Sequence, residues 1–266
     1  MRAYLDNDPR VCVWLAGLVK YGLLPAGCVV REDIRRPAVD YAAFDVVHFF
    51  AGIGGWELAL QYSGVLKELP RPIWTGSCPC QPFSGLNQKR KGEEDVRHLW
   101  PCWRDRIAEH RPAVVFGEQV ASPDGRAWLA IVLSDLEELG YIAAAADLCA
   151  ACVGAPQRRQ RLWFGAVDDA VRQGLRVRNA ERQRACSQDA PAGMPGFGGC
   201  WREVEWIYCE PGVWRPIEPG LEPLAHGVSA GMVRCRGYGN AIVPQVGAVF
   251  IRAFWEAVCD LTLQCS

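Results

Sequence analysis

A cysteine held between two prolines is the strongest chemical feature of the sequence. Cys80 follows Pro79 and is separated from Pro82 by Gln81 alone, in a segment that comes directly after the run Ile73 to Gly76. Because a proline ring fixes its own backbone angle, prolines on both sides stiffen the loop and hold the thiol in one place. A fixed thiol at the carboxyl end of a parallel strand lies where α/β enzymes do their chemistry. We therefore predict that Cys80 is a nucleophile.

A glycine-rich turn marks a second place where a ligand could bind. The apolar run Val46 to Phe50 leads into Ala51 to Gly55, and a helical pattern follows from Trp56 to about Leu66. Glycines let the backbone turn tightly, and free N–H groups at a helix start favour an anionic or polar ligand. A dinucleotide dehydrogenase would carry an acidic residue about 20 positions later, where Ile73 to Gly76 stands instead. The turn indicates a polar ligand other than a nicotinamide dinucleotide, or a tight turn alone.

Five motifs, in order over about residues 45–255, resemble those of the DNA cytosine-5 methyltransferases. They are Phe50-Ala51-Gly52-Ile53-Gly54-Gly55, Pro79-Cys80-Gln81, Glu118-Gln119-Val120, Gln157-Arg158-Arg159-Gln160-Arg161 and Gly239-Asn240-Ala241-Ile242-Val243-Pro244. One such motif could arise by chance, whereas five in order are highly specific. The resemblance implies an α/β fold with a Rossmann-like sheet, S-adenosylmethionine as cofactor and double-stranded DNA as partner.

The resemblance also implies a role for each reacting group. Cys80 would add to carbon 6 of a cytosine and push electron density onto carbon 5, which then accepts the methyl group. Glu118 would stabilise the charge that develops at the ring nitrogen, while Arg159 and Arg161 would support the loop and the base. Because a base inside a duplex is out of reach, the cytosine would have to be flipped out.

The cofactor would be held by the residues of the glycine motif together with Pro79 and Asn240, again by resemblance. Two positions nearby differ from the family. His48 stands in the region where the family usually has an Asp before its Phe-Ala-Gly, and Gln119 replaces an Asn. An amide of either length can hydrogen-bond, and neither change removes a reacting group.

The order of the amino-terminal motifs departs from the family. Only 23 residues separate Gly55 from Pro79, which leaves no room for the acidic motif and the Asp-Ile motif that the family has there. Two segments at the front of the chain resemble these missing pieces, namely Tyr4-Leu5-Asp6-Asn7-Asp8-Pro9 and Arg31-Glu32-Asp33-Ile34. We therefore predict a permuted chain, in which the second and third strands of the sheet come first in sequence.

The permuted order assigns ligand contacts to four residues. Asp6, with Asn7, would hold the ribose hydroxyls, since a carboxylate accepts two such bonds well. Asp33 would accept from the adenine amine, with Ile34 beside it. The alternative is that Asp6 and Asp8 only cap the helix that begins at Pro9.

Strands and helices must position these motifs, and the apolar pattern predicts where they lie. Strands are expected over residues 27–30, 46–50, 73–76, 113–116, 142–146 and 161–167, and helices over 8–20, 56–66, 97–109, 125–139 and 245–261. Such alternation implies a mostly parallel sheet with helices on both faces. We expect a catalytic domain over 1–167, a small irregular target-recognition module over 168–229 and a return to the catalytic domain over 230–266.

The recognition module is rich in Arg, Gly, Pro and Trp. Residues Arg172 to Arg184 could follow phosphates, and Gly193 to Trp201 could reach base edges. Its tryptophans Trp201, Trp206 and Trp214 are more typical of a small packed core. The sequence does not reveal the target site.

Cysteine usage points to reduced thiols. The chain has 13 cysteines and a start that does not resemble a signal peptide, so most are expected to be buried as small apolar residues. Cys78 is one of these, because the family's nucleophile follows the proline rather than preceding it. Cys149 and Cys152 form a C-x-x-C without a second pair at zinc spacing, and we expect no metal.

Composition narrows the class of protein further. The net charge is −1, so affinity for DNA must come from local arginine patches. No apolar run approaches the roughly 20 residues that cross a bilayer, and we expect a cytoplasmic monomer that does not contact a membrane. Whether a restriction endonuclease accompanies it stays open.

Three other functions remain as alternatives to DNA methylation. The chain could be an inactive DNA-binding relative, which the presence of Cys80, Glu118 and Arg159 disfavours. It could methylate transfer RNA on the same scaffold. It could also be a thiol oxidoreductase that uses Cys149 and Cys152, a reading that leaves the other motifs unexplained.

Overall fold

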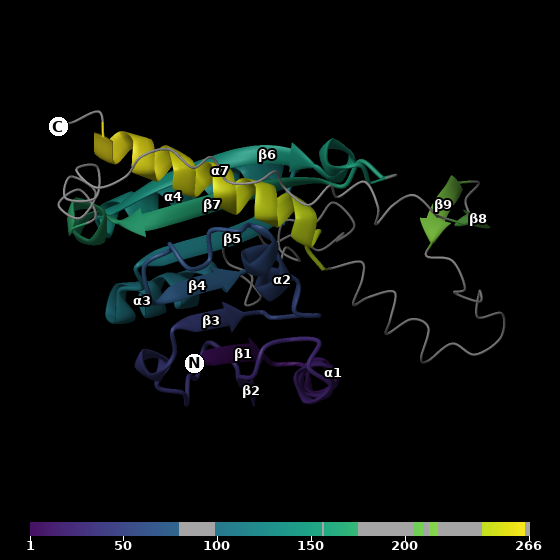
Figure 1. Ribbon diagram of the computed structural model, residues 1–266, viewed down its shortest axis with the longest axis horizontal. Helices are drawn as coiled ribbons and strands as arrows, with labels where there is room; N and C mark the ends of the chain where they lie inside the picture. Colours follow the sequence, from purple (N-terminus) through teal and green to yellow (C-terminus); the bar gives the residue numbers. More distant parts are fainter. Residues whose placement is uncertain (80–98, 156, 175–204, 210–212, 218–240, 264–266) are drawn as a thin grey trace, which may run out of the picture.

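The computed structural model describes residues 1–79, 99–155, 157–174, 205–209, 213–217 and 241–263. Seven strands form one sheet: β1 Arg2–Asp6, β2 Cys28–Arg31, β3 Val46–Phe49, β4 Ile73–Gly76, β5 Val114–Val120, β6 Tyr141–Cys149 and β7 Gln160–Asp168. The helices are α1 Pro9–Lys20, α2 Gly55–Tyr62, α3 Trp100–His110, α4 Pro123–Glu138 and α7 Pro244–Leu263. Figure 1 shows their arrangement.

The strand order is β2-β1-β3-β4-β5-β7-β6. The first five strands are parallel, and β7 is antiparallel both to β5 and to β6. Within this sheet β7 therefore runs against the other six strands. The expected α/β class and mostly parallel sheet are confirmed.

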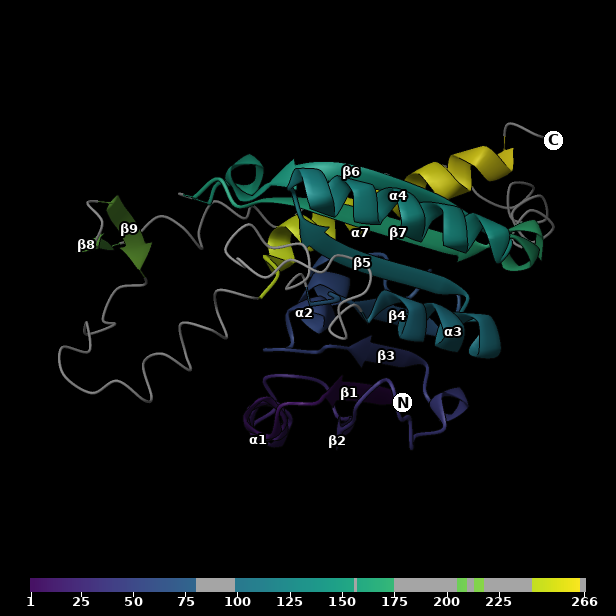
Figure 2. The same ribbon diagram turned by 180° about the vertical axis from the view of Figure 1, so that it is seen from behind.

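Helices cover both faces of the sheet, as Figures 1 and 2 show from opposite sides. On one face, α3 and α4 bury Trp100, Trp103 and Trp128 against Val47, Trp74 and other strand residues. On the other face, α2 and α7 pack with the alternate side chains of the same strands. The α1 helix joins this second face through Leu15, which lies in a small cluster with Tyr4. The alternation of strand side chains thus builds two cores from one sheet.

Local sequence signals set where the main helices begin. Asp8 caps α1 by accepting from the Arg10 N–H at 2.8 Å, and Pro9 occupies the first helical turn. Ser122 caps α4 in the same way, accepting from the Gly125 N–H at 3.0 Å. Each cap satisfies a backbone donor that the helix itself leaves free, so the helix starts at a defined residue.

Several predicted boundaries are wrong. Strand β5 continues to Val120 rather than ending at Phe116, because it pairs with β7 over its whole length. Helix α2 ends at Tyr62 instead of about Leu66, just before Gly64 takes a left-handed φ of +77°. The apolar pattern does not predict strand β1, although the predicted permutation requires a strand at that place.

Two more strands lie inside the range expected for the irregular module. They are β8 Glu205–Cys209 and β9 Val213–Ile217, which pair antiparallel as a separate two-stranded sheet. No helix in the described part of the chain has the length and apolar character to span a membrane.

Candidate active site

A cavity opens at the carboxyl ends of β1, β2 and β3, beside the segment that follows β4. It is lined by Leu5, Asp6, Asn7, Glu32, Asp33, Ile34, Phe49, Phe50, Pro79 and Leu99. Six of the predicted ligand-binding residues meet here, from segments far apart in sequence. The chain leaves β3 for a helix on one face and β4 for a helix on the other. Open α/β sheets bind ligands at such a divergence.

Asp6 joins the end of β1 to the glycine turn. Its Oδ1 accepts from the Asp8 N–H at 2.9 Å, and its Oδ2 accepts from the Gly52 N–H at 3.1 Å. Burial raises the pKa of the Asp6 carboxyl, and these backbone hydrogen bonds oppose that shift. Since a carboxylate oxygen has two lone pairs, each oxygen can accept one more bond from a ligand.

Asp33 is held by a neighbouring arginine. The Arg35 Nε–H and Nη2–H donate to the two carboxylate oxygens at 2.9 and 2.6 Å, and the Arg35 backbone N–H adds a third bond at 3.1 Å. The Arg35 guanidinium lowers the pKa of Asp33, which is therefore an ionised acceptor. Ile34 is buried next to it and supplies an apolar wall.

Glu32 also lines the cavity, although the sequence motifs did not predict a role for it. Its carboxylate accepts from the Tyr41 hydroxyl and from the Ala38 N–H, and only 8% of the residue is exposed. The signal was its place directly before Asp33, in a segment already matched to a ligand-binding motif. Its bonds fix the loop that carries Asp33 and Ile34.

The glycine turn is shaped by two left-handed residues. Gly52 has φ of +54° and Gly54 has φ of +86°, conformations that side chains disfavour. A Cβ at Gly54 would also lie 2.7 Å from a Leu24 methyl group. Of the six residues of this predicted motif, Phe50 lines the cavity. The Gly52 N–H donates to Asp6, which lines the cavity. Ala51, Ile53, Gly54 and Gly55 form the turn behind the cavity.

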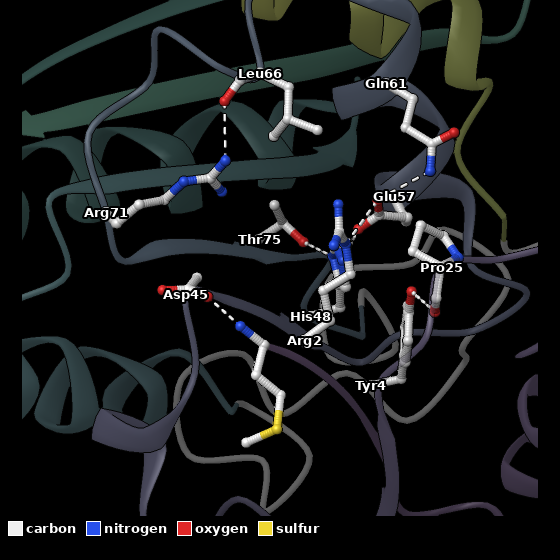
Figure 3. A network of polar contacts seen from close by, with 11 residues as sticks. Arg2, Tyr4, Pro25, Asp45, His48, Glu57, Gln61, Leu66, Arg71 and Thr75 are labelled. Atoms are coloured by element: carbon white, nitrogen blue, oxygen red, sulfur yellow. Dashed lines mark hydrogen bonds and ion pairs between the residues drawn. The ribbon is translucent and has the colours of Figure 1, made fainter.

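A buried polar network clamps the two ends of this turn (Figure 3). His48, before the turn, bonds through Nδ1 to Thr75 Oγ1 at 2.8 Å and through Nε2 to Glu57 Oε2 at 2.9 Å. Glu57, after the turn, also accepts from Arg2 Nε at 2.9 Å and from Gln61 Nε2 at 3.0 Å. Burial opposes ionisation of Glu57, but these partners outweigh it and lower the pKa of its carboxyl.

Glu118 lies buried beside the base of the predicted nucleophile loop. The residue is 6% exposed, and Arg161 Nε lies 2.9 Å from Glu118 Oε1. Burial raises the pKa of Glu118, against the charges of Arg161 and Arg159 and a hydrogen bond from Ser77. Ser77 in turn accepts from Trp56 Nε1 at 3.0 Å. Sequence reasoning missed Ser77, although it stands three residues before Cys80.

The two predicted arginines take separate partners. Arg161 pairs with Glu118, whereas Arg159 donates through Nη2 to the Ala241 carbonyl. Arg159 has a positive φ of 31°, which turns the chain just before β7. Ala241 directly follows Asn240, so Arg159 ties the last motif to the others. Cys80 and Asn240 themselves lie outside the described residues.

Cys78, the second thiol of the nucleophile loop, and Arg172, the first arginine of the expected recognition module, both have little exposure to solvent. Cys78 is 5% exposed, and burial raises the pKa of its thiol far above the ordinary value. It is the small packed residue that the sequence predicts, but the other six cysteines in the described part are exposed or only partly buried, so the expectation that most are buried is wrong there. Arg172 lies with its Nη2 2.7 Å from Asp169 Oδ1, and its side chain is 11% exposed. Arg172 is therefore no free phosphate contact, and residues up to Arg184 lie almost wholly outside the described part.

Comparisons with known proteins agree with these motifs. Residues 66–187 match the family model for C-5 cytosine-specific DNA methylase. The chain is 34% identical over 175 residues to type II methyltransferase M.AplI of Arthrospira platensis, covering 53% of this chain and 50% of that protein. It is 31% identical over 155 residues to type II methyltransferase M.HhaI of Haemophilus parahaemolyticus, covering 44% and 47%.

A solved structure with a similar arrangement is a DNMT2 mutant from Spodoptera frugiperda. It is 18% identical, with a TM-score of 0.39, and the match covers 62% of this chain and 41% of that one. The chain thus spans half or less of the length of each of these relatives.

Proposed function

We infer that this chain belongs to the C-5 cytosine-specific DNA methylase family, and from that premise we propose that it methylates carbon 5 of a cytosine in duplex DNA. The methyl donor in this proposal is S-adenosylmethionine. The observation that carries the proposal is the buried Glu118, which Arg161 and Ser77 hold at the base of the loop that leads to Cys80.

The cavity has the groups that S-adenosylmethionine would need. Asp6 keeps lone pairs for two ribose hydroxyls, and the ionised Asp33 can accept from an exocyclic amine. Apolar side chains of Ile34, Phe50 and Leu99 can enclose the faces of an adenine ring. The bound cofactor would supply an electrophilic methyl group. Asn7 and Pro79 also line the cavity and would contact the cofactor.

The nucleophile in this proposal is the thiolate of Cys80. Its sulfur forms a bond to carbon 6 of the cytosine, and the electron pair of the carbon 5–carbon 6 double bond becomes available at carbon 5. Pro79 and Pro82 limit the backbone freedom of this loop, which lowers the entropy lost when the sulfur is aligned. After methyl transfer, loss of the carbon 5 proton and of the sulfur restores the aromatic ring.

Glu118 supplies the proton at the ring nitrogen. Because burial raises its pKa, its carboxyl keeps a proton at a higher pH than an exposed glutamate does. A neutral carboxylic acid can donate a hydrogen bond to the ring nitrogen and stabilise the charge that builds there. Arg161 and Ser77 hold the carboxyl in one orientation, and Arg161 limits the shift so that the group can still release its proton.

We further propose that the chain is permuted relative to its family. The acidic residues at the ends of β1 and β2 reach the cavity although they precede the glycine turn in sequence. Strand β3, which leads into that turn, lies between β1 and β4. This order gives Asp6 and Asp33 the positions that the family's two missing motifs would fill. The segment 168–229 would then serve as the target-recognition module.

The test is methyl transfer from radiolabelled S-adenosylmethionine to duplex DNA or to transfer RNA. We expect label in the duplex at carbon 5 of cytosine, and a loss of at least about a thousandfold for Cys80→Ser because the oxygen is a far weaker nucleophile. Cys78→Ser, which alters a packed thiol, is the matched control and should retain transfer. Label in RNA alone, or in neither substrate, would contradict the proposal.

A further inference from the structure

Two thiols lie in contact at the end of β6, away from the cavity. Cys149 is the last residue of β6, and Cys152 lies in the short 3-10 helix Ala150–Val153. Their Sγ atoms are 3.0 Å apart, with Cys152 exposed and Cys149 partly exposed. Neither thiol has a part in the proposed methyl transfer.

The backbone holds this turn in a shape that suits bond formation. The Ala150 N–H donates to the Arg158 carbonyl at 2.8 Å, and the Ala155 N–H donates to the Ala150 carbonyl at 3.2 Å. Ala150, between these bonds, is fully buried. A disulfide has an S–S distance of about 2.05 Å. The sulfurs therefore need to approach by only about 1 Å, a side-chain movement that leaves the anchored turn in place.

The two thiols differ in acidity. A hydrogen bond from Cys152, assisted by backbone N–H groups and by Arg158, lowers the pKa of Cys149. The same bond raises the pKa of Cys152. Since the thiolate is the attacking species, Cys149 would react first and Cys152 second.

We propose that Cys149 and Cys152 form a redox-active dithiol that exchanges with small-molecule disulfides. The Cys149 thiolate attacks one sulfur of the disulfide, whose S–S bond breaks and releases one thiolate, which takes up a proton. Cys152 then loses its proton to solvent and attacks the Cys149 sulfur, and the second small thiol leaves. Two electrons pass from the protein dithiol to the disulfide, which becomes two thiols.

The dithiol lies at the end of the strand that pairs with β7, which carries Arg161. Cys149 pairs with Gln160 and Leu148 pairs with Arg161 in the β6–β7 register. The proposal does not rest on the methylation chemistry, because it needs only the two thiols and the turn that holds them.

The test uses reduced full-length protein and oxidised glutathione as the probe disulfide. Samples are quenched in acid after graded times, free thiols are alkylated, and peptides are identified by mass spectrometry. We expect an internal Cys149–Cys152 disulfide in the wild type. We expect a trapped glutathione adduct on Cys149 in Cys152→Ser, forming at least about tenfold faster than the adduct on the exposed Cys28.

Cys149→Ser should slow adduct formation at Cys152 to the rate of Cys28 or below. Cys149 and Cys152 lie in one tryptic peptide, residues 127–158, where fragment ions that break the chain between them assign each modification. Because the other cysteines lie in other peptides, reactions there cannot be mistaken for this one. If Cys149 and Cys152 stay separately alkylated at every glutathione ratio, or if the Cys149 adduct forms no faster than that of Cys28, the proposal is wrong.

Discussion

Asp33 shows how a single residue can be prepared for a ligand before the ligand arrives. Arg35 keeps its carboxylate ionised and oriented, with an Nη2–Oδ2 distance of 2.6 Å. The side chain of Asp33 is still 35% exposed, so its remaining lone pairs can reach a bound molecule. In the proposed function this carboxylate recognises the adenine amine.

Replacing Asp33 with Ala should therefore weaken binding of S-adenosylmethionine. The loss of one charge-assisted hydrogen bond, about 1.5–3 kcal/mol, corresponds to a roughly 10- to 150-fold rise in Kd. Titration calorimetry measures the affinity, and thermal unfolding should show an unchanged midpoint because Asp33 is not part of the core.

Arg35→Ala is the control for this prediction. It removes the ion pair but leaves the carboxylate, so the affinity should stay within about threefold of wild type. If Asp33→Ala binds the cofactor as tightly as wild type, the assignment of Asp33 to the adenine amine is wrong.

Site residues could be predicted from the sequence where they belong to a recognisable motif. They were missed where only the folded chain brings them into the site. Asp6, Asp33 and Phe50 were expected at the ligand and do line the cavity. Glu32 and Ser77 were not, because their role depends on bonds to Tyr41 and Glu118 that no local pattern encodes.

At the scale of elements, the glycine turn is held by its flanks rather than by its own residues. His48 on β3 and Glu57 on α2 bond to each other across the turn, and Arg2 brings in β1. His48 and Glu57 are each about 1% exposed, so unmatched polar groups there would be costly.

We expect Glu57→Ala to reduce the free energy of unfolding by about 3–5 kcal/mol, since it leaves His48 and Arg2 without their carboxylate. Glu57→Gln should cost less, because the amide can still accept one bond. Glu137→Ala on the exposed end of α4 is the control, expected within about 0.5 kcal/mol of wild type. Urea unfolding gives all three values.

The same variants predict a pH dependence. The folded pKa of Glu57 is below its ordinary value, so its charge contributes stability above the unfolded pKa of about 4.3 and loses that contribution as pH falls through the folded pKa. The gap between wild type and Glu57→Gln should therefore shrink in acid. A gap that grows as pH falls would contradict the ion-pair assignment.

Element types were predictable from the sequence, whereas several boundaries were not. Strand β4 was predicted over its full length, because its buried run is short and bounded. The last residues of β5 are fixed by pairing with β7, and the short β1 by its two neighbours. Pairing with a strand distant in sequence does not change the apolar periodicity of either strand, so the pattern of one strand cannot predict it.

At the scale of the whole molecule, Met1 lies beside the segments that lead into β3 and β4. The Met1 ammonium pairs with the Asp45 carboxylate, and the Ile73 N–H donates to the Asp45 carbonyl at 2.8 Å. Arg71 lines the same hollow as Met1 and Asp45. The starts of β1, β3 and β4 therefore meet at one edge of the sheet.

A rearranged chain should fold to the same sheet. It would run from 45 to 70, then 1 to 44, then 71 to 266, with short Gly-Ser linkers at the two new junctions. Because those junctions join ends that already lie close together, we expect a thermal midpoint within about 5 °C of wild type and the same affinity for S-adenosylmethionine. Calorimetry and circular dichroism measure both.

Scrambling the same pieces so that 1–44 follows residue 139 is the control, since this separates β1 from β3. The control should fail to fold. Should the family-ordered chain fail as well, under conditions where wild type folds, the proposed permutation would lose its support.

The position of β1 between β2 and β3 has a consequence for how the protein is made. During synthesis Arg2–Asp6 and Cys28–Arg31 leave the ribosome before Val46–Phe49, so β1 can pair with β2 but lacks its other neighbour until Val46–Phe49 has emerged. The nascent chain must therefore carry one edge of β1 unpaired while the centre of the sheet is still being translated.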